Sequence, residues 1–410
     1  MGIPIAFLAS IWLRLARLLY CWPPFAPSPA FDRRATAGGP ACFARLRGMR
    51  ATSPEEQPDR MDDGHASLGA RKPMLSSSEL RHRFASEFRP RRWLYWLDML
   101  VSAATGWTLF ALSATQPLGS PLHVASSLGA VFALLRAVLF IHELAHRRSE
   151  ELPGFELTWN VLVGIPVQVP SLMYVDSHMD HHRRTAFGTV ADPEYAPIAR
   201  WSRFRIASFV LTVSTLPVLL PIRWALIGPL SHLFPGLRRL TVARLSTLAI
   251  NSRYRRPEPR PRQRPRWEAQ EAGAALFAWA LLGSVVLGWI PLALLGQWWI
   301  VAAGVWIVNQ VRTLAAHGYE HEGEPVDTEG QLLDSINLRG GVAFTSLVAP
   351  VGLRYHALHH YLPTLPYHSL GRVHRQLLRL LPPDSPYRRT LRGGLLDHLQ
   401  KVWDRAAAPA

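Results

Sequence analysis

The sequence predicts an all-α integral membrane protein, with about four transmembrane helices in two hairpins and a cytoplasmic helical cap. Three observations predict this class. Two long runs, 99–135 and 272–311, contain no charged residue, although the chain of 410 residues carries a net charge of +16. Hydrophobic residues make up 49% of the sequence. Ten of the 17 histidines lie in four short stretches beside apolar segments, and we expect these stretches to belong to the cap.

The positive charge flanks the apolar runs and is not interleaved with aromatic residues on one folded face. This distribution suits a membrane protein with basic cytoplasmic loops and excludes nucleic acid as a partner. Cys21 and Cys42 are the only cysteines, so we expect neither a disulfide framework nor a cysteine metal site. Residues 1–73, rich in Arg, Pro, Ala and Gly, are expected to be a disordered extension. A membrane domain over 74–400 and a tail over 401–410 follow.

The first charge-free run predicts two helices joined by a turn. Residues 116–121 read Gln-Pro-Leu-Gly-Ser-Pro, which is a turn signal. Each flanking half holds roughly 20 residues, enough to cross a hydrocarbon core of ~30 Å. Arg136, near the end of the second half, is placed to extend its guanidinium toward the lipid headgroups.

The second charge-free run predicts another hairpin, with Pro291 and Gly296 marking its turn. Neither predicted turn carries a basic residue. By the positive-inside rule, the opposite, Arg-rich side faces the cytoplasm, and all four histidine stretches fall on that side. The arginines of that side lie in these segments: 147–148, 183–184, 200–205 and 253–266.

Two further segments are apolar but interrupted. Residues 157–175 are uncharged, yet Pro166 and Pro170 divide them, so we expect a broken or interfacial segment there. Residues 206–234 are mostly apolar and are interrupted by Pro221. They fit either a short hairpin or an amphipathic stretch on the membrane surface, and the sequence leaves this choice open.

Three of the histidine stretches have spacings that suit a metal site on helices. One pair is spaced i, i+4, and two triplets are spaced i, i+3, i+4, which places the rings of each set on one helical face. Imidazole is the commonest protein ligand of transition metals. A ninth imidazole directly follows the second charge-free run. The predicted ligands are His142, His146, His178, His181, His182, His317, His356, His359 and His360.

Nine imidazoles exceed the four ligands that one zinc ion normally takes, so we expect two metal ions with four or five ligands each. His321 lies one turn beyond the ninth ligand, and the sequence leaves open whether it is a ligand or a surface residue. Carboxylates orient such imidazoles by accepting the hydrogen bond of the second ring nitrogen. The candidates for this role are Glu143, Asp180, Asp192 and Asp334.

Residues 142–146 read His-Glu-Leu-Ala-His, which also matches the pattern of zinc metalloproteases, with Glu143 as the general base. A protease would leave the two His-x-x-His-His stretches without a role. Zinc also has no redox chemistry, whereas a pair of irons with open positions activates dioxygen and oxidises C–H bonds. A further alternative is a non-catalytic membrane protein that stores or senses metal, and the complete ligand set argues against it.

The three boxes 142–146, 178–182 and 356–360 resemble those of the integral-membrane fatty acid desaturases and their hydroxylase relatives. Those boxes have the forms H-x-x-x-H, H-x-x-H-H and H-x-x-H-H. The resemblance covers residues 95–385 approximately. It implies a non-haem diiron enzyme with four membrane helices, a cytoplasmic cap and two Fe ions. Some members use an additional histidine between the second and third boxes, and His317 matches it in position.

From this resemblance we predict a membrane fatty acid desaturase, which dehydrogenates a lipid acyl chain with O2 and electrons at a diiron centre. A fatty acid or lipid hydroxylase and a carotenoid oxygenase of the same superfamily remain alternatives. The predicted partners are the membrane, a lipid or acyl substrate and an electron donor. Because the sequence contains no His-Pro-Gly-Gly haem motif, we expect a separate donor such as a ferredoxin with its reductase.

Overall fold

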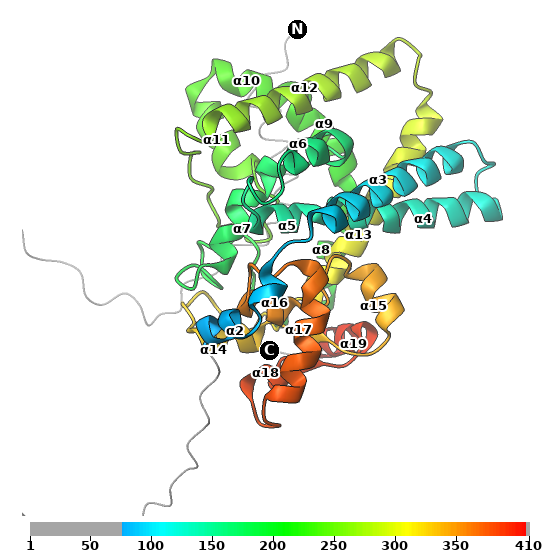
Figure 1. Ribbon diagram of the computed structural model, residues 1–410. Coiled ribbons are helices and arrows are strands. Elements are labelled where there is room, and N and C mark those ends of the chain that lie inside the picture. The colour runs from blue at the N-terminus through cyan, green and yellow to red at the C-terminus, as the bar shows by residue number, and fades with distance from the viewer. Residues whose placement is uncertain (1–75, 407–410) are drawn as a thin grey trace, which may run out of the picture. The chain divides into compact units, whose positions relative to one another are not determined.

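The computed structural model describes residues 76–406, and this part of the chain is almost entirely helical (Figure 1). Within the described range, the only strands are β1 (Asn337–Leu338) and β2 (Leu391–Arg392), which pair in parallel. The all-α prediction is therefore confirmed. The predicted disordered extension over 1–73 lies outside the described residues.

Five helical runs are long and apolar enough to cross a membrane, which supports a multi-pass membrane protein. Four of them are the arms of the two predicted hairpins. The fifth contains the segment that the sequence left undecided, so the described residues hold five candidate spans where about four were expected. The runs are Arg92–Ala114, Pro121–His146, Arg203–Leu233, Arg264–Val286 and Leu292–Leu314.

The first hairpin forms as predicted. Helices α3 (Arg92–Ala114) and α4 (Pro121–Val138) pack against each other, and α5 (Phe140–His146) continues the direction of α4 (Figure 1). Ser120 caps α4, because its hydroxyl accepts a hydrogen bond from the backbone N–H of His123 at 3.2 Å. The first histidine box therefore lies at the far end of a membrane helix from the turn.

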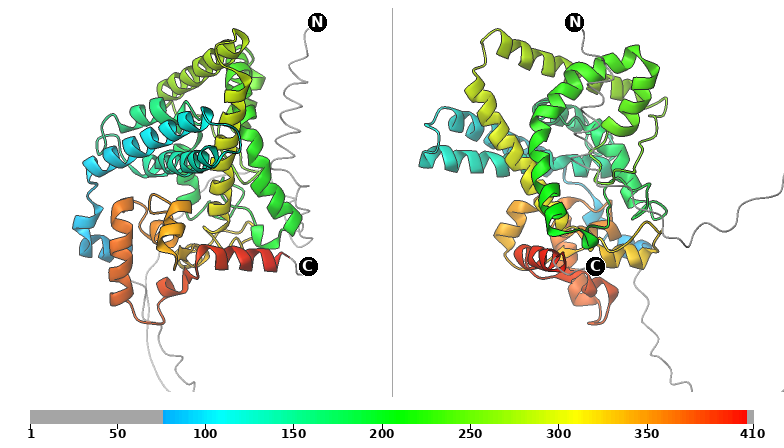
Figure 2. Two further views of the ribbon diagram at one scale, coloured as in Figure 1. Left: turned by 90° about the vertical axis from the view of Figure 1, so that its right-hand side faces the viewer. Right: turned by 180° about the vertical axis from the view of Figure 1, so that it is seen from behind.

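The second hairpin is open. Helices α12 (Arg264–Val286) and α13 (Leu292–Leu314) diverge from their turn, as Figures 1 and 2 show. The turn occupies 287–291, and Gly296, which was expected to mark it, lies inside α13. Helix α13 packs against α3, α4 and the 203–222 part of the fifth run, whereas α12 packs against its 216–233 part. The two arms thus share the fifth run as a neighbour, but only α13 also packs on the first hairpin.

The fifth run is helical throughout but irregular. Pro217 and Pro221 lack a backbone N–H, and the hydrogen-bond ladder changes to 3₁₀ and π turns beside them. Helix α11 (Pro235–Leu245) follows the run. The elements of the run are α8 (Arg203–Leu211), η6 (Thr212–Thr215), α9 (Leu216–Ile222), η7 (Arg223–Ile227) and α10 (Gly228–Leu233).

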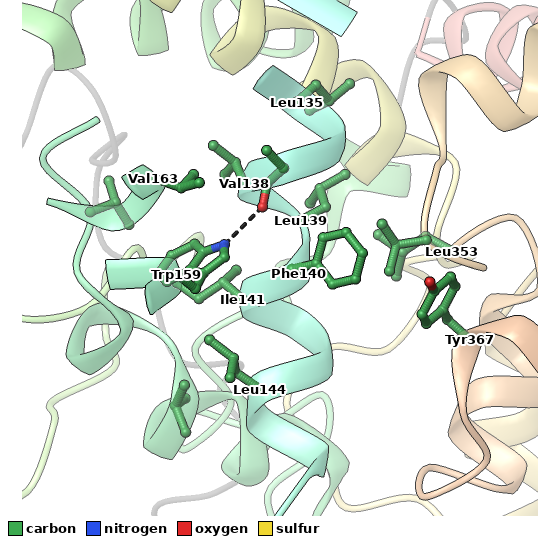
Figure 3. Close-up of a cluster of buried hydrophobic side chains, with 14 of the residues drawn as sticks. Leu135, Val138, Leu139, Phe140, Ile141, Leu144, Trp159, Val163, Leu353 and Tyr367 are labelled. Carbon is green, nitrogen blue, oxygen red and sulfur yellow. Dashed lines mark hydrogen bonds between the residues drawn. The ribbon is translucent and has the colours of Figure 1, made fainter. Parts of the chain in front are cut away.

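The segment expected to be broken is broken. It consists of α6 (Phe155–Trp159), η3 (Asn160–Gly164) and η4 (Ser171–Met173), and α7 (Val175–His182) follows. Trp159 is fully buried against the helix of the first box, and its indole N–H donates to the carbonyl oxygen of Ala137 at 2.8 Å (Figure 3). This apolar packing holds the first box in place.

The remaining helices form the cap, which gathers around the ends of α5 and α13 (Figures 1 and 2). Helix α16, which carries the third box, contacts α14, α17 and β1. Helix α19 extends past residue 400, where we expected the tail to begin. The cap elements are α2 (Ser77–Arg83), η2 (Ala85–Phe88), η5 (Ile198–Arg200), α14 (Thr328–Asp334), α15 (Val342–Val348), α16 (His356–Tyr361), α17 (Tyr367–Leu380), α18 (Pro386–Arg389) and α19 (Leu395–Arg405).

Candidate metal centre

The nine predicted ligands come from four short segments that meet at one place. The first box is in α5, the second in α7 and the third in α16, so each box is helical as its spacing predicts. His317 lies three residues beyond α13, where a β-bridge to Ser335 fixes its backbone. Eight of the nine residues are buried, and His182 is partly buried.

The nine imidazoles divide into two groups. In each group, one ring nitrogen from every histidine lies within 4.8 Å of those of the other members. The first group has five members and the second has four, and together they include every predicted ligand. The five-histidine group is His142, His146, His178, His182 and His359. The four-histidine group is His181, His317, His356 and His360.

The Nε2 atoms point toward the centre of each group. In the five-histidine group, Nε2 of His178 lies 3.0 Å from Nε2 of both His146 and His182. In the four-histidine group, Nε2 of His317 lies 2.8 Å from that of His356 and 3.2 Å from that of His181. Such short separations gather the nitrogen lone pairs of several rings in a small volume.

The two groups adjoin each other. His181 and His182, neighbours in α7, belong to different groups, and their ring centroids are 5.7 Å apart. The ring of His182 also stacks on that of His360 with a centroid separation of 4.3 Å. Two ions bound in these groups would therefore occupy neighbouring positions.

Three carboxylates face outward Nδ1 atoms: Asp192 and Glu194 accept hydrogen bonds from them, and Asp334 lies at ion-pair distance. Asp192 is 3.0 Å from Nδ1 of His181, and Asp334 is 3.2 Å from Nδ1 of His317. Both were predicted. The third, Glu194, lies 2.6 Å from Nδ1 of His178 and was missed. An Nδ1–H donated to a carboxylate leaves the Nε2 lone pair free for a metal.

The only sequence signal for Glu194 is its place two residues after Asp192, in the loop beyond the second box. Because it lies twelve residues past His182 in an irregular segment, no helical periodicity relates it to the box. Burial alone raises the pKa of Glu194, but the adjacent His178 ring outweighs burial and lowers this pKa to about 2. The carboxyl group is therefore ionised.

Glu143 and Asp180 do not hold imidazoles, so these two expectations are corrected. Glu143 accepts a short hydrogen bond from the hydroxyl of Tyr95 and faces the backbone N–H of Tyr367 at 3.5 Å. Asp180 bonds instead to Arg183, at 2.5 Å, and to Tyr254. Each carboxylate lies next to a box histidine in sequence, but one residue turns a side chain by about 100° around a helix.

The orientation of Glu143 also bears on the protease alternative. A general base in that mechanism must face the metal-bound water, whereas this carboxylate is 2% exposed and faces Tyr95 on the other side of α5.

His321 is the other open assignment. It belongs to neither group, and its Nε2 lies 4.0 Å from the carboxylate of Asp334.

The site fits metal ions on its own geometry. Both ring nitrogens of His142 are buried without a hydrogen-bond partner among residues 76–406, although this side chain lies inside the five-histidine group. Burial, and next the neighbouring histidines, lower the pKa values of His182, His359 and His360 well below the ordinary value of 6.5. Neutral rings with converging lone pairs repel one another unless a cation lies between them. A donor set made of imidazoles suits iron, zinc, copper or nickel.

One member of the four-histidine group behaves differently. Burial lowers the pKa of His181, but the attraction of Asp192 outweighs it, and the net shift is upward. This carboxylate is fully buried and also accepts hydrogen bonds from the backbone N–H groups of Gly188 and Glu194. The backbone of the loop 187–195 thus holds Asp192 in place as the partner of His181.

A cavity adjoins the centre next to α13 and the 203–233 run. Four of the predicted ligands line it, together with apolar residues of α13 and of the 203–233 run, including Trp306, Val213 and Leu216. These ligands are His142, His181, His317 and His356. An apolar wall next to a redox-capable centre is suited to a hydrocarbon substrate, because it excludes water from the chain.

Fold and site together define a multi-pass membrane protein with a histidine-lined metal centre at the helix ends. The sequence model of the family described as "Fatty acid desaturase" matches residues 119–392. A protein named "Ceramide hydroxylase" from Caulobacter vibrioides (strain NA1000 / CB15N) is 40% identical over 316 residues, which is 77% of this chain and 90% of the relative. The chain belongs to the fatty acid desaturase family, and the predicted resemblance is confirmed. It is a membrane oxidoreductase of a lipid-oxidising family.

Proposed function

We propose that this protein is a membrane lipid hydroxylase, which inserts one oxygen atom of O2 into a C–H bond of a ceramide-type lipid. The observation that carries an oxidative function is the convergence of nine imidazoles in two adjoining groups. The choice of hydroxylation rests on the relative named "Ceramide hydroxylase". It favours the alternative given above over the acyl-chain desaturation that we predicted first.

In this proposal the five- and four-histidine groups each hold one iron ion. Bound iron supplies the activation of dioxygen that zinc lacks. Hydroxylation consumes one O2, two electrons and two protons for each C–H bond converted to C–OH, and releases one water. Desaturation consumes the same reagents but removes two hydrogens and releases two waters. The electrons come from a separate carrier such as a ferredoxin with its reductase.

The protein's own groups have three tasks in this reaction. Asp192 and Glu194 accept Nδ1–H hydrogen bonds, so that His181 and His178 keep the tautomer that binds metal, and Asp334 faces Nδ1 of His317 at ion-pair distance. The apolar wall of the cavity positions the hydrocarbon and excludes water. The positive-inside rule places the centre on the cytoplasmic side, where a soluble electron carrier has access.

The proposal is tested by expressing the chain in a host supplied with ceramide and comparing lipid masses. A gain of one oxygen atom supports hydroxylation, and a loss of two hydrogens supports desaturation. His181→Ala should abolish the product, whereas His398→Ala, at a buried histidine outside both groups, should retain it. Purified protein should contain two irons per chain. One zinc and no iron would favour the metalloprotease alternative.

A further inference from the structure

The cavity beside the metal centre has one polar wall. Its apolar residues come from Trp306, from Val213 and Leu216 of the 203–233 run and from the segment 248–250, but the end of α13 contributes Asn309, Gln310 and Arg312. A channel that only accommodates a hydrocarbon chain needs no such groups. The polar wall therefore calls for an explanation from the substrate.

Gln310 is the most informative residue of this wall. It is 7% exposed, yet its side-chain amide makes no hydrogen bond to any residue in the described range, and it lines the cavity. Buried amides are normally paired, because an unpaired one loses its hydration without compensation. Gln297 on the same helix shows the usual arrangement, since its amide bonds to Ser113, Ser127 and His123.

Arg312 is the second polar group. Its guanidinium donates to the side-chain oxygen of Asn309 at 3.1 Å and to the hydroxyl of Thr313 at 3.2 Å, both on its own helix. It forms no ion pair within residues 76–406. Most of its donors thus remain available to an acceptor such as a hydroxyl or carbonyl oxygen. The carboxylate that lines the same cavity, Glu194, bonds instead to His178 and Tyr174.

We propose that Gln310 and Arg312 bind the amide and hydroxyl groups of an N-acylated lipid head, and that the oxidised carbon lies near that head. This inference rests on the hydroxylase function proposed above. A Gln side chain both donates and accepts, as an amide ligand requires, whereas the guanidinium only donates. The apolar Val213 and Leu216 then receive the start of a hydrocarbon tail.

The predicted metal ligand His317 lines the same cavity as Gln310 and Arg312. A lipid head held by the last turn of α13 therefore lies in the same cavity as the metal-binding groups. The new oxygen is expected on the part of the chain next to the amide and not in its distal half.

Binding tests the head-recognition claim without requiring turnover. The probes are N-octanoyl sphinganine and an analogue in which an ester oxygen replaces the amide N–H, titrated calorimetrically into the purified full chain in detergent. The wild type should bind the amide about tenfold more tightly, and Gln310→Leu should reduce this ratio to near one. Gln297→Leu is the matched control: it removes a paired glutamine from the same helix and should lower stability but keep the ratio.

Two outcomes overturn the inference: no amide preference in the wild type, or an unchanged preference in Gln310→Leu. If the leucine variant fails to fold, Gln310→Met provides the same comparison with an unbranched side chain. Tandem mass spectrometry of the wild-type product locates the oxygen, and a position in the distal half of the chain contradicts the second half of the proposal. Amide preference without any oxygenated product would refute the hydroxylase function and leave head recognition supported.

Discussion

Replacing Asp192 with asparagine should disable one half of the metal centre. The carboxylate is fully buried and accepts three N–H groups: Nδ1 of His181 at 3.0 Å, and the backbone N–H of Gly188 and of Glu194 at 3.0 and 2.8 Å. Asparagine has the same shape but only one acceptor oxygen, and its NH2 group is a donor. At least one of the three N–H groups must then face another donor.

The expected cost follows from these contacts. One unsatisfied buried donor costs ~1–3 kcal/mol, and loss of the charged acceptor of His181 removes a further bond of about 1.5–3 kcal/mol. The His181 ring is then free to move its proton to Nε2, which removes a ligand from the four-histidine group. Loss of such outer partners lowers metal affinity about 10–100-fold. We expect Asp192→Asn to lose iron from one of the two positions.

The assay is iron content per chain during titration with a chelator, together with product formation. Asp180→Asn is the matched control, because this carboxylate lies in the second box but bonds to Arg183 and Tyr254. The control should keep both irons. If Asp192→Asn retains two irons with wild-type affinity and full turnover, the assigned role of the carboxylate is wrong.

Three other predictions concern stability. A Cβ at Gly304 would lie 2.7 Å from the side chain of Val131, so Gly304→Leu should cost about 1–3 kcal/mol of folding free energy. Gly296→Leu, on the same helix with no neighbour within 4 Å, should leave the melting temperature unchanged. Glu271→Leu leaves the buried Arg223 at 3.3 Å and Arg238 at 2.8 Å without their carboxylate and should cost about 3–5 kcal/mol, of which Arg223→Met should restore a part in the double variant. Chelation of the metal should lower the melting temperature and ferrous iron should restore it, whereas equal melting temperatures would contradict metal binding to the folded state.

Much of the fold was predictable because membrane spans depend on local composition. A charge-free run of roughly forty residues with a Pro- and Gly-containing centre fixes a pair of helices and their turn. The 203–233 run was not predictable to the same degree. Pro217 and Pro221 suggest a break, but neighbouring helices support 3₁₀ and π turns and keep the run helical. That support is a property of packing and is absent from the local sequence.

The site shows the same division. The spacings i, i+3 and i+4 place imidazoles on one helical face, so the sequence alone was enough to identify the three histidine boxes. The role of Glu194 could not, because it depends on how an irregular loop folds back on α7. Conversely, Glu143 and Asp180 are next to box histidines in the sequence and were therefore expected to orient imidazoles, yet the helix turns both carboxylates away from the imidazoles.

The sequence by itself determined the nine histidines, their helical faces and their position beside apolar runs, because each of these follows from residues that are near one another in the chain. Only the tertiary structure decided how the rings divide into five and four, which carboxylates hold them, and that the amide of Gln310 faces the cavity. The division of the rings joins segments separated by more than a hundred residues, such as His146 and His359, and the carboxylates reach their imidazoles through irregular loops. Their contacts depend on the packing of the whole chain and not on any local pattern.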